Sequence, residues 1–148
     1  MYDIIEIDLS KLDTSNVVGM HYMFNGCSSL TLINFNGINT TSVGSFMYMF
    51  ANCRSLKSID LSNFKTSSTQ ILWSMFENCT ELTSIDLSNF DTSLVTNFQH
   101  IFYNCAKLEY INLKNSKDDS TIYYVEAFSF IKKKFSYLFR FIQSPKVI

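Results

Sequence analysis

The chain has 148 residues, of which 47% are apolar and 17% are charged, so it can bury a core but carries fewer charges than the roughly 25% usual for soluble domains. The net charge of -1 is unevenly distributed, since residues 1–116 carry 10 acidic and 6 basic side chains whereas residues 117–148 carry 3 acidic and 6 basic. The first segment therefore lacks the basic surface that nucleic-acid binding requires, and we expect no nucleic-acid partner.

The chain starts in repeat-like sequence, Met1-Tyr-Asp-Ile-Ile-Glu-Ile-Asp. This start has neither the basic stretch nor the apolar run of a secretion signal. It predicts either a cytoplasmic protein or a piece of a longer exported chain.

The most informative feature is an internal repeat of 26 residues, marked by its four cysteines, Cys27, Cys53, Cys79 and Cys105. A Leu-x-x-Ile-x-Leu/Phe motif begins three residues after each cysteine. A period of this length is typical of arrays in which neighbouring repeats bury each other's apolar faces. A cysteine that recurs once per repeat predicts a structural column of reduced, buried thiols rather than a framework of disulfides.

Each repeat predicts one strand followed by one helix. The Ile and Leu of the motif alternate with polar residues, which favours a short strand with one buried face. The strands are expected near residues 4–9, 32–36, 58–62, 84–88 and 110–114. Apolar residues then recur at i, i+3, i+6, i+7 and i+10, after hydroxyl side chains suited to capping, which predicts helices near residues 16–27, 42–53, 68–79 and 94–105.

Two dense phrases, LxSIDLSNFDTS (Leu82 to Ser93) and MxxMFxNC (Met47 to Cys53), resemble the BspA-type leucine-rich repeat of bacterial and protist surface proteins. The resemblance implies an α/β solenoid, a right-handed coil with a parallel β-sheet on one face and helices on the other. The resemblance covers residues 1 to about 114, and the predicted solenoid takes in residues 1–116, as about four full repeats plus a fifth strand. It also implies a surface-exposed or extracellular protein that acts in adhesion or protein–protein contact and is not an enzyme.

Reading down the repeats gives a candidate binding surface on the presumed concave face of the sheet. Its residues occupy the polar strand positions and their neighbours, and they form a mildly acidic face rich in hydroxyl groups that could dock a protein partner or a host surface component. The alternative is a solvated strand face in which Asn residues dilute the repulsion between Asp residues. The candidate residues are Asp8, Asn34, Ser58, Asp60, Ser62, Ser84, Asp86, Ser88, Tyr110 and Asn112.

Catalytic and metal-binding sites find little support in the sequence. His21 and His100 fall at different repeat positions, so they do not form an aligned pair. No His lies at ligand spacing from a Cys-x-x-Cys motif, and no Gly-rich phosphate loop occurs among the four glycines. We therefore predict no catalytic residues, no metal and no cofactor.

Residues 117–148 break the period. Ser120 can cap a helix that extends to about Gln143, with a heptad-like apolar stripe and basic residues that include Lys132, Lys133, Lys134 and Arg140. Three interpretations remain open for this predicted C-terminal helix: a cap over the last repeat, a basic amphipathic helix that lies on a membrane or a partner, or a degenerate repeat without an evolved role.

Overall fold

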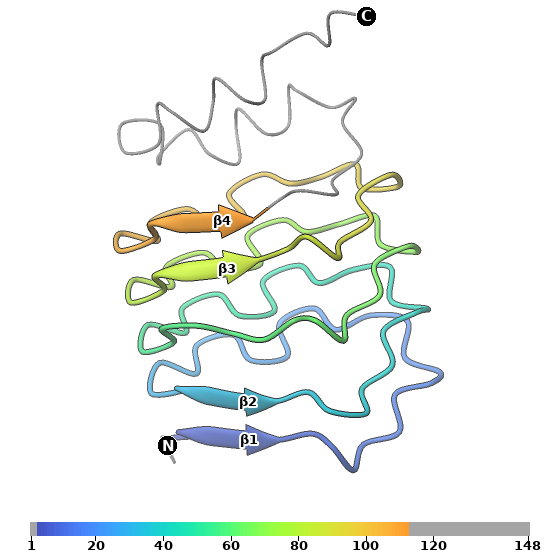
Figure 1. Cartoon of the computed structure of the whole chain (residues 1–148), viewed down its shortest axis with the longest axis horizontal. Coiled ribbons are helices and arrows are strands. Elements are labelled where there is room, and N and C mark those ends of the chain that lie inside the picture. The colour runs from blue at the N-terminus through green and yellow to red at the C-terminus, as the bar shows by residue number, and fades with distance from the viewer. Residues whose placement is uncertain (1–2, 113–148) are drawn as a thin grey trace, which may run out of the picture.

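The structure, a computed structural model, describes residues 3–112. Each repeat forms one layer, and the layers lie above one another from β1 to β4 (Figure 1). We number the layers 1 to 4, for residues 4–29, 30–55, 56–81 and 82–107. The strands of the described region are β1 (Glu6–Asp8), β2 (Leu32–Asn34), β3 (Ser84–Asp86) and β4 (Tyr110–Asn112).

The predicted α/β leucine-rich-repeat solenoid is wrong. Residues 3–112 contain no helix, and their strands form two separate parallel two-stranded sheets, β1 with β2 and β3 with β4. The strand predicted at residues 58–62 does not form, so no continuous sheet covers one face. The predicted C-terminal helix within residues 117–148 lies outside the described residues.

Consecutive turns occupy the four segments predicted to be helical, and their backbone amides alternate between two kinds of partner. In layer 2, Tyr48 N donates to Trp73 O in the next layer (3.0 Å), whereas Met49 N donates to Phe46 O in its own turn (3.1 Å). The first kind joins residues 25 positions apart, and the second spans three residues instead of the four of an α-helix. Turns therefore satisfy the same apolar spacing that predicted a helix.

Left-handed backbone explains why a helix cannot form there. Two positions in each repeat have positive φ, which a right-handed helix does not tolerate. One is the residue before each cysteine, Gly or Asn, the residue types that adopt this conformation most readily. These residues are Gly26 (φ 79°), Asn52 (63°), Asn78 (58°) and Asn104 (57°). The other position, four residues earlier, holds Tyr22, Tyr48, Ser74 and His100.

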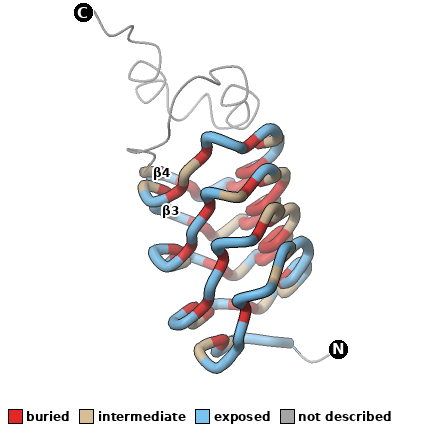
Figure 2. The backbone as a smooth tube through the Cα atoms, turned by 90° about the vertical axis from the view of Figure 1, so that its right-hand side faces the viewer, coloured by how far each residue is buried: buried red, intermediate tan, exposed pale blue. Residues whose placement is uncertain are grey.

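The positions predicted to be apolar and buried do form the core. Buried residues recur at the same places in each layer (Figure 2). Four phenylalanine rings stack in a ladder through the interior, one per layer, with centroid separations of 5.3–5.6 Å and nearly parallel planes. They are Phe24, Phe50, Phe76 and Phe102. Met23 is an exception to the predicted burial, since its side chain is 40% exposed in the first layer.

Threonine hydroxyls link the layers beside the strands. Thr40 Oγ1 donates to Lys65 O (3.0 Å) and accepts from Lys65 N (2.7 Å). Thr14 and Thr66 make the same pair of bonds to Asn39 and Asp91. The predicted helix caps therefore bridge between layers instead, and they fix how each layer sits on the next.

Asparagine side chains form a second link between the layers. Asn52 Nδ2 donates to Asn25 Oδ1 (3.2 Å), and Asn78 Nδ2 to Asn52 Oδ1 (3.0 Å). Asn104 Nδ2 continues the ladder to Asn78 Oδ1 (2.9 Å). Together, the two side-chain ladders hold the layers in register and so set the spacing of the strand side chains.

Candidate binding face

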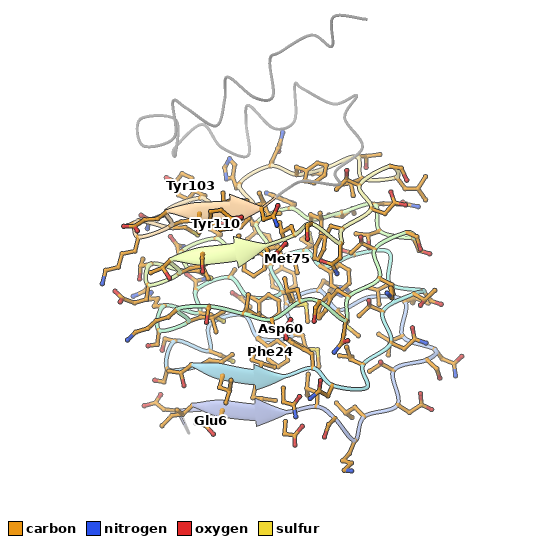
Figure 3. All side chains as sticks on the ribbon, in the orientation of Figure 1. Glu6, Phe24, Asp60, Met75, Tyr103 and Tyr110 are labelled. Atoms are coloured by element: carbon orange, nitrogen blue, oxygen red, sulfur yellow. The ribbon has the colours of Figure 1, made fainter. Side chains whose placement is uncertain are left out.

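The candidate residues from the sequence lie on one side of the stack, along the strands. Glu6 and Tyr110 mark the two ends of this strand face, and Asp60 lies between them (Figure 3). The five residues at the centre of the face, one per strand position, form what we call the polar column: Asp8, Asn34, Asp60, Asp86 and Asn112. All five side chains are exposed or half-buried.

Most members of the polar column turn the chain at the end of its strand. A side-chain oxygen accepts a hydrogen bond from the amide two residues later: Ser62 N donates to Asp60 Oδ1 (2.9 Å), and Ser88 N donates to Asp86 Oδ1 (2.8 Å). Asp8 and Asn34 make the same contact. The Asp/Asn pattern thus has a local structural cause, because short oxygen-bearing side chains make this turn. This turn contact uses one carboxylate oxygen of each Asp, and the second oxygen of Asp86 accepts a hydrogen bond from Asn112 Nδ2.

These hydrogen bonds also keep the carboxylates ionised. The backbone amide of Ser62, followed by its side chain, lowers the pKa of Asp60 below its ordinary value. The side chain and then the amide of Ser88 lower the pKa of Asp86 in the same way. Both groups therefore carry a full negative charge at neutral pH. Neither forms an ion pair within residues 3–112, where the one salt bridge joins Lys107 to Glu81.

The sequence of the polar column explains part of the break in the sheet. Asp8 pairs in register with Asn34, and Asp86 pairs with Asn112, whose Nδ2 donates to Asp86 Oδ2 (3.1 Å). Asp60 and Asp86 are instead successive carboxylates, and like charges opposite each other destabilise strand pairing. Strand pairing is also absent between the layers of Asn34 and Asp60, where the charges of these two side chains do not explain its absence.

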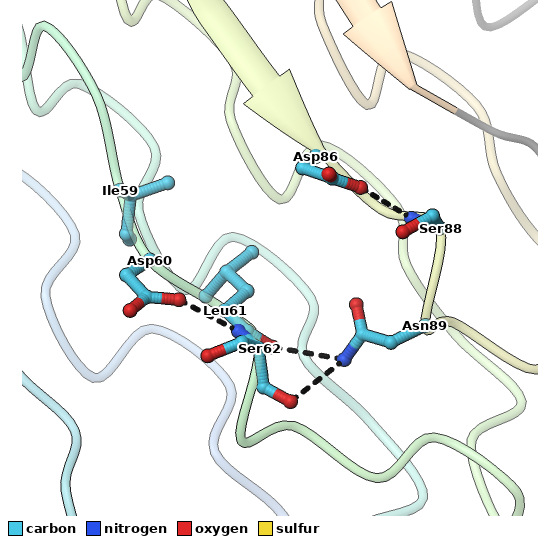
Figure 4. A pocket seen from close by; sticks show the side chains of 7 residues that line it. All are labelled: Ile59, Asp60, Leu61, Ser62, Asp86, Ser88 and Asn89. Carbon is cyan, nitrogen blue, oxygen red and sulfur yellow. Dashed lines mark hydrogen bonds between the residues drawn. The ribbon is translucent and has the colours of Figure 1, made fainter.

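A depression of about 190 Å³ opens where layer 3 and layer 4 fail to pair (Figure 4). Leu61 and the half-buried Ile59 give it an apolar part, and Asp60 and Asp86 flank it. The remaining lining residues are Ser62, Ser88 and Asn89.

Asn89 holds the two layers together beside this depression. Its Nδ2 lies within hydrogen-bonding distance of three carbonyl oxygens of layer 3, those of Leu61 (3.0 Å), Ser62 (3.2 Å) and Phe64 (3.0 Å). Sequence reasoning missed this residue. The segment SIDLSNF occurs identically at 58–64 and 84–90, so no local signal separates Asn89 from Asn63.

Two large side chains stand out beside the polar column. Leu32 in β2 is 57% exposed and Tyr110 in β4 is 56% exposed, at the position that Ser58 and Ser84 occupy in the layers between them. Tyr110 was among the candidates from the sequence, and Leu32 was not. The strand face therefore combines carboxylates, hydroxyls and two exposed apolar groups.

The cysteines lie away from this face. Cys53, Cys79 and Cys105 are buried, Cys27 is half-buried, and all four are free thiols. Each buried thiol donates to the carbonyl of a phenylalanine in the layer before it, as from Cys79 Sγ to Phe50 O (3.1 Å). Burial raises the pKa of Cys53 and Cys105 to about 12, so these thiols stay protonated and unreactive.

The described part of the chain offers neither a metal-ion cluster nor a membrane-spanning helix. Residues 3–112 contain no group of three or more His, Cys, Asp or Glu side chains arranged to hold a metal ion. Within the same residues, no helix has the length and apolar character needed to span a bilayer.

One comparison with known proteins gives a result. The family described as "Mycoplasma protein of unknown function, DUF285" matches residues 2–116, which include the whole described region. No curated protein and no solved structure matches the chain. The repeats that build the layers and the strand face are thus the part that the family shares, and the chain belongs to the DUF285 family.

Proposed function

We propose that the chain is a non-catalytic binding module that engages a protein partner through its strand face. The observation that carries this proposal is the pair of exposed side chains, Leu32 and Tyr110, on a face that also carries the ionised carboxylates of Asp60 and Asp86. Large apolar and aromatic groups at strand positions are costly to hydrate, and Tyr is enriched where protein interfaces concentrate their binding energy. The same strands also contain buried positions for apolar side chains, since the neighbouring Ile33 and Ile111 belong to the core. A lack of buried positions therefore does not explain why Leu32 and Tyr110 are exposed.

We also propose that this module acts in adhesion at a cell surface, against a partner protein or a host surface component. The support is the resemblance of the phrases at Met47 to Cys53 and Leu82 to Ser93 to BspA-type surface proteins. The repeated layers provide a rigid, extended display of side chains, which suits contact with a large partner.

The proposal is tested by adhesion of beads coated with the full chain to host cells. The variants are Tyr110→Ala and the double change Asp60→Lys with Asp86→Lys. We expect both to reduce adhesion strongly. The matched control is Asp13→Lys, because the exposed Asp13 makes the same turn contact to the Ser15 amide (3.0 Å) away from the polar column. Adhesion that is equal in all four proteins, with unchanged melting temperatures, would exclude the strand face.

A further inference from the structure

The depression between layers 3 and 4 has an unusual imbalance between hydrogen-bond donors and acceptors. The carboxylates of Asp60 and Asp86 only accept hydrogen bonds when ionised, and the Ser62 and Ser88 side chains that also line the depression hydrogen-bond to these carboxylates. The Asn89 amide has both kinds of group, but its Nδ2 is committed to carbonyl oxygens of layer 3. The orientation of this amide is fixed by those bonds, so its Oδ1 remains as an acceptor beside the depression (Figure 4).

The shape of the site adds a second constraint. An apolar part formed by Ile59 and Leu61 lies next to the acceptors, in a volume of about 190 Å³. A ligand that fits must therefore combine a hydrogen-bond donor that accepts nothing with a short apolar stem. A small metal ion would use only the acceptors, and a neutral sugar would bring as many acceptors as donors.

We propose that this depression binds an arginine side chain of the partner protein. The guanidinium group has five donors and no acceptor, and its planar fork suits carboxylates. It would lie between Asp60 and Asp86 and donate to Asn89 Oδ1, while its methylene stem packs over Ile59. The inference rests on the proposed function, because it names how the strand face selects its partner.

The missing pairing at the Asp60–Asp86 step then has a functional explanation. At the two strand pairs that do form, an Asn lies opposite each Asp. At the Asp60–Asp86 step two carboxylates succeed one another with no Asn between them, and a bound cation supplies the compensation that Asn supplies elsewhere.

The test is a titration of the full chain with N-acetyl-arginine amide, followed by amide chemical shifts in NMR. N-acetyl-citrulline amide is the matched probe, since it replaces the guanidinium with a neutral urea group of similar shape. We expect saturable shifts at Ser62, Ser88 and Asn89 with the arginine probe. Citrulline should bind roughly tenfold more weakly, and Asp60→Asn should weaken arginine by a similar factor.

The control variant is Asp13→Asn, which removes one negative charge from the same kind of turn elsewhere and should leave the arginine affinity unchanged. Equal binding of citrulline, or an unchanged affinity in Asp60→Asn, would overturn the proposal. So would an absence of saturable shifts at the three amides. If the arginine probe fails while the Asp60→Lys and Asp86→Lys chain still loses adhesion, only this inference falls and the proposed function stands.

Discussion

The threonine column offers a sharp test of how the layers are joined, because one substitution should have opposite effects at two equivalent positions. Thr40 lies between layers 2 and 3, is fully buried, and exchanges two hydrogen bonds with the backbone of Lys65. Thr92 occupies the same position two repeats later. Its Oγ1 is buried and finds no hydrogen-bond partner among the described residues. Thr→Val keeps the shape of the side chain and removes only the hydroxyl.

The magnitudes follow from these contacts. In Thr40→Val, the Lys65 amide and carbonyl both lose their partner, and each unsatisfied buried group costs about 1–3 kcal/mol. Because these two hydrogen bonds are part-buried, we take the lower part of that range for each group and expect the free energy of unfolding to fall by about 2–4 kcal/mol. In Thr92→Val no bond is lost and an unpaired hydroxyl is removed, so stability should be unchanged or rise by up to about 1 kcal/mol.

Urea unfolding monitored by the fluorescence of Trp73, the single tryptophan, measures both effects. Thr66→Val is the matched control, since Thr66 bonds to Asp91 as Thr40 bonds to Lys65, and it should lose as much stability as Thr40→Val. Equal losses in Thr40→Val and Thr92→Val would refute the assignment of the threonine hydroxyls as links between layers.

Three further outcomes are expected. Phe76→Ala should lower the free energy of unfolding by about 3–5 kcal/mol, because Phe76 is fully buried and stacks on a phenylalanine ring in the layer on each side. Urea unfolding measures this loss, and a loss as small as that of an exposed residue would contradict the phenylalanine ladder. Asn78 has a φ of 58°, so the melting temperature should fall in the order unchanged chain, Asn78→Gly, Asn78→Ala. Asn78→Gly loses only the side-chain hydrogen bonds of the Asn ladder, whereas Asn78→Ala also strains the backbone. An Asn78→Ala variant as stable as Asn78→Gly would count against the left-handed turn. For Cys53, burial raises the pKa from 9.0 to about 12, so the unfolded chain releases the thiol proton at lower pH than the folded chain does. The stability that this group contributes is therefore present below pH 9 and is lost as the pH rises toward 12. Cys53→Ala should flatten the fall in melting temperature across that range, and a slope identical to that of the unchanged chain would contradict the assignment.

The sequence predicted the repeat period and most of the core, because both depend on which residues recur. Ile33, Ile85 and Ile111 are buried as their alternation with polar residues predicts, and so are most of the apolar residues predicted to be buried in the segments between the strands. The wrong inference was to assign those segments to helices. A spacing of three and four residues fits successive turns as well as an α-helix, and the residue before each cysteine carried the distinguishing signal. Asn52, Asn78 and Asn104 recur where the backbone turns left-handed.

The candidate binding face was predictable as a set of positions but not as a site. Its polar column follows from the repeat, and all of its members lie on the strand face. The depression does not follow from the repeat, because it depends on where pairing between layers fails and on the reach of one side chain. Asn89 contacts the layer before it, and its equivalent Asn63 lies in the same seven-residue sequence, so local sequence carries no information about the difference.

The most direct measurement for the account as a whole is the scalar coupling through backbone hydrogen bonds in NMR, which identifies the donor and acceptor of each bond. The proposed strand face depends on stacked layers, and the layers stack through turn segments whose backbone amides donate hydrogen bonds to carbonyls of the next layer. The structure predicts a coupling between Tyr48 N and the carbonyl carbon of Trp73, and likewise between Phe50 N and that of Met75. A coupling from Tyr48 N to the carbonyl of Gly44, the partner it would have in an α-helix, would contradict the account.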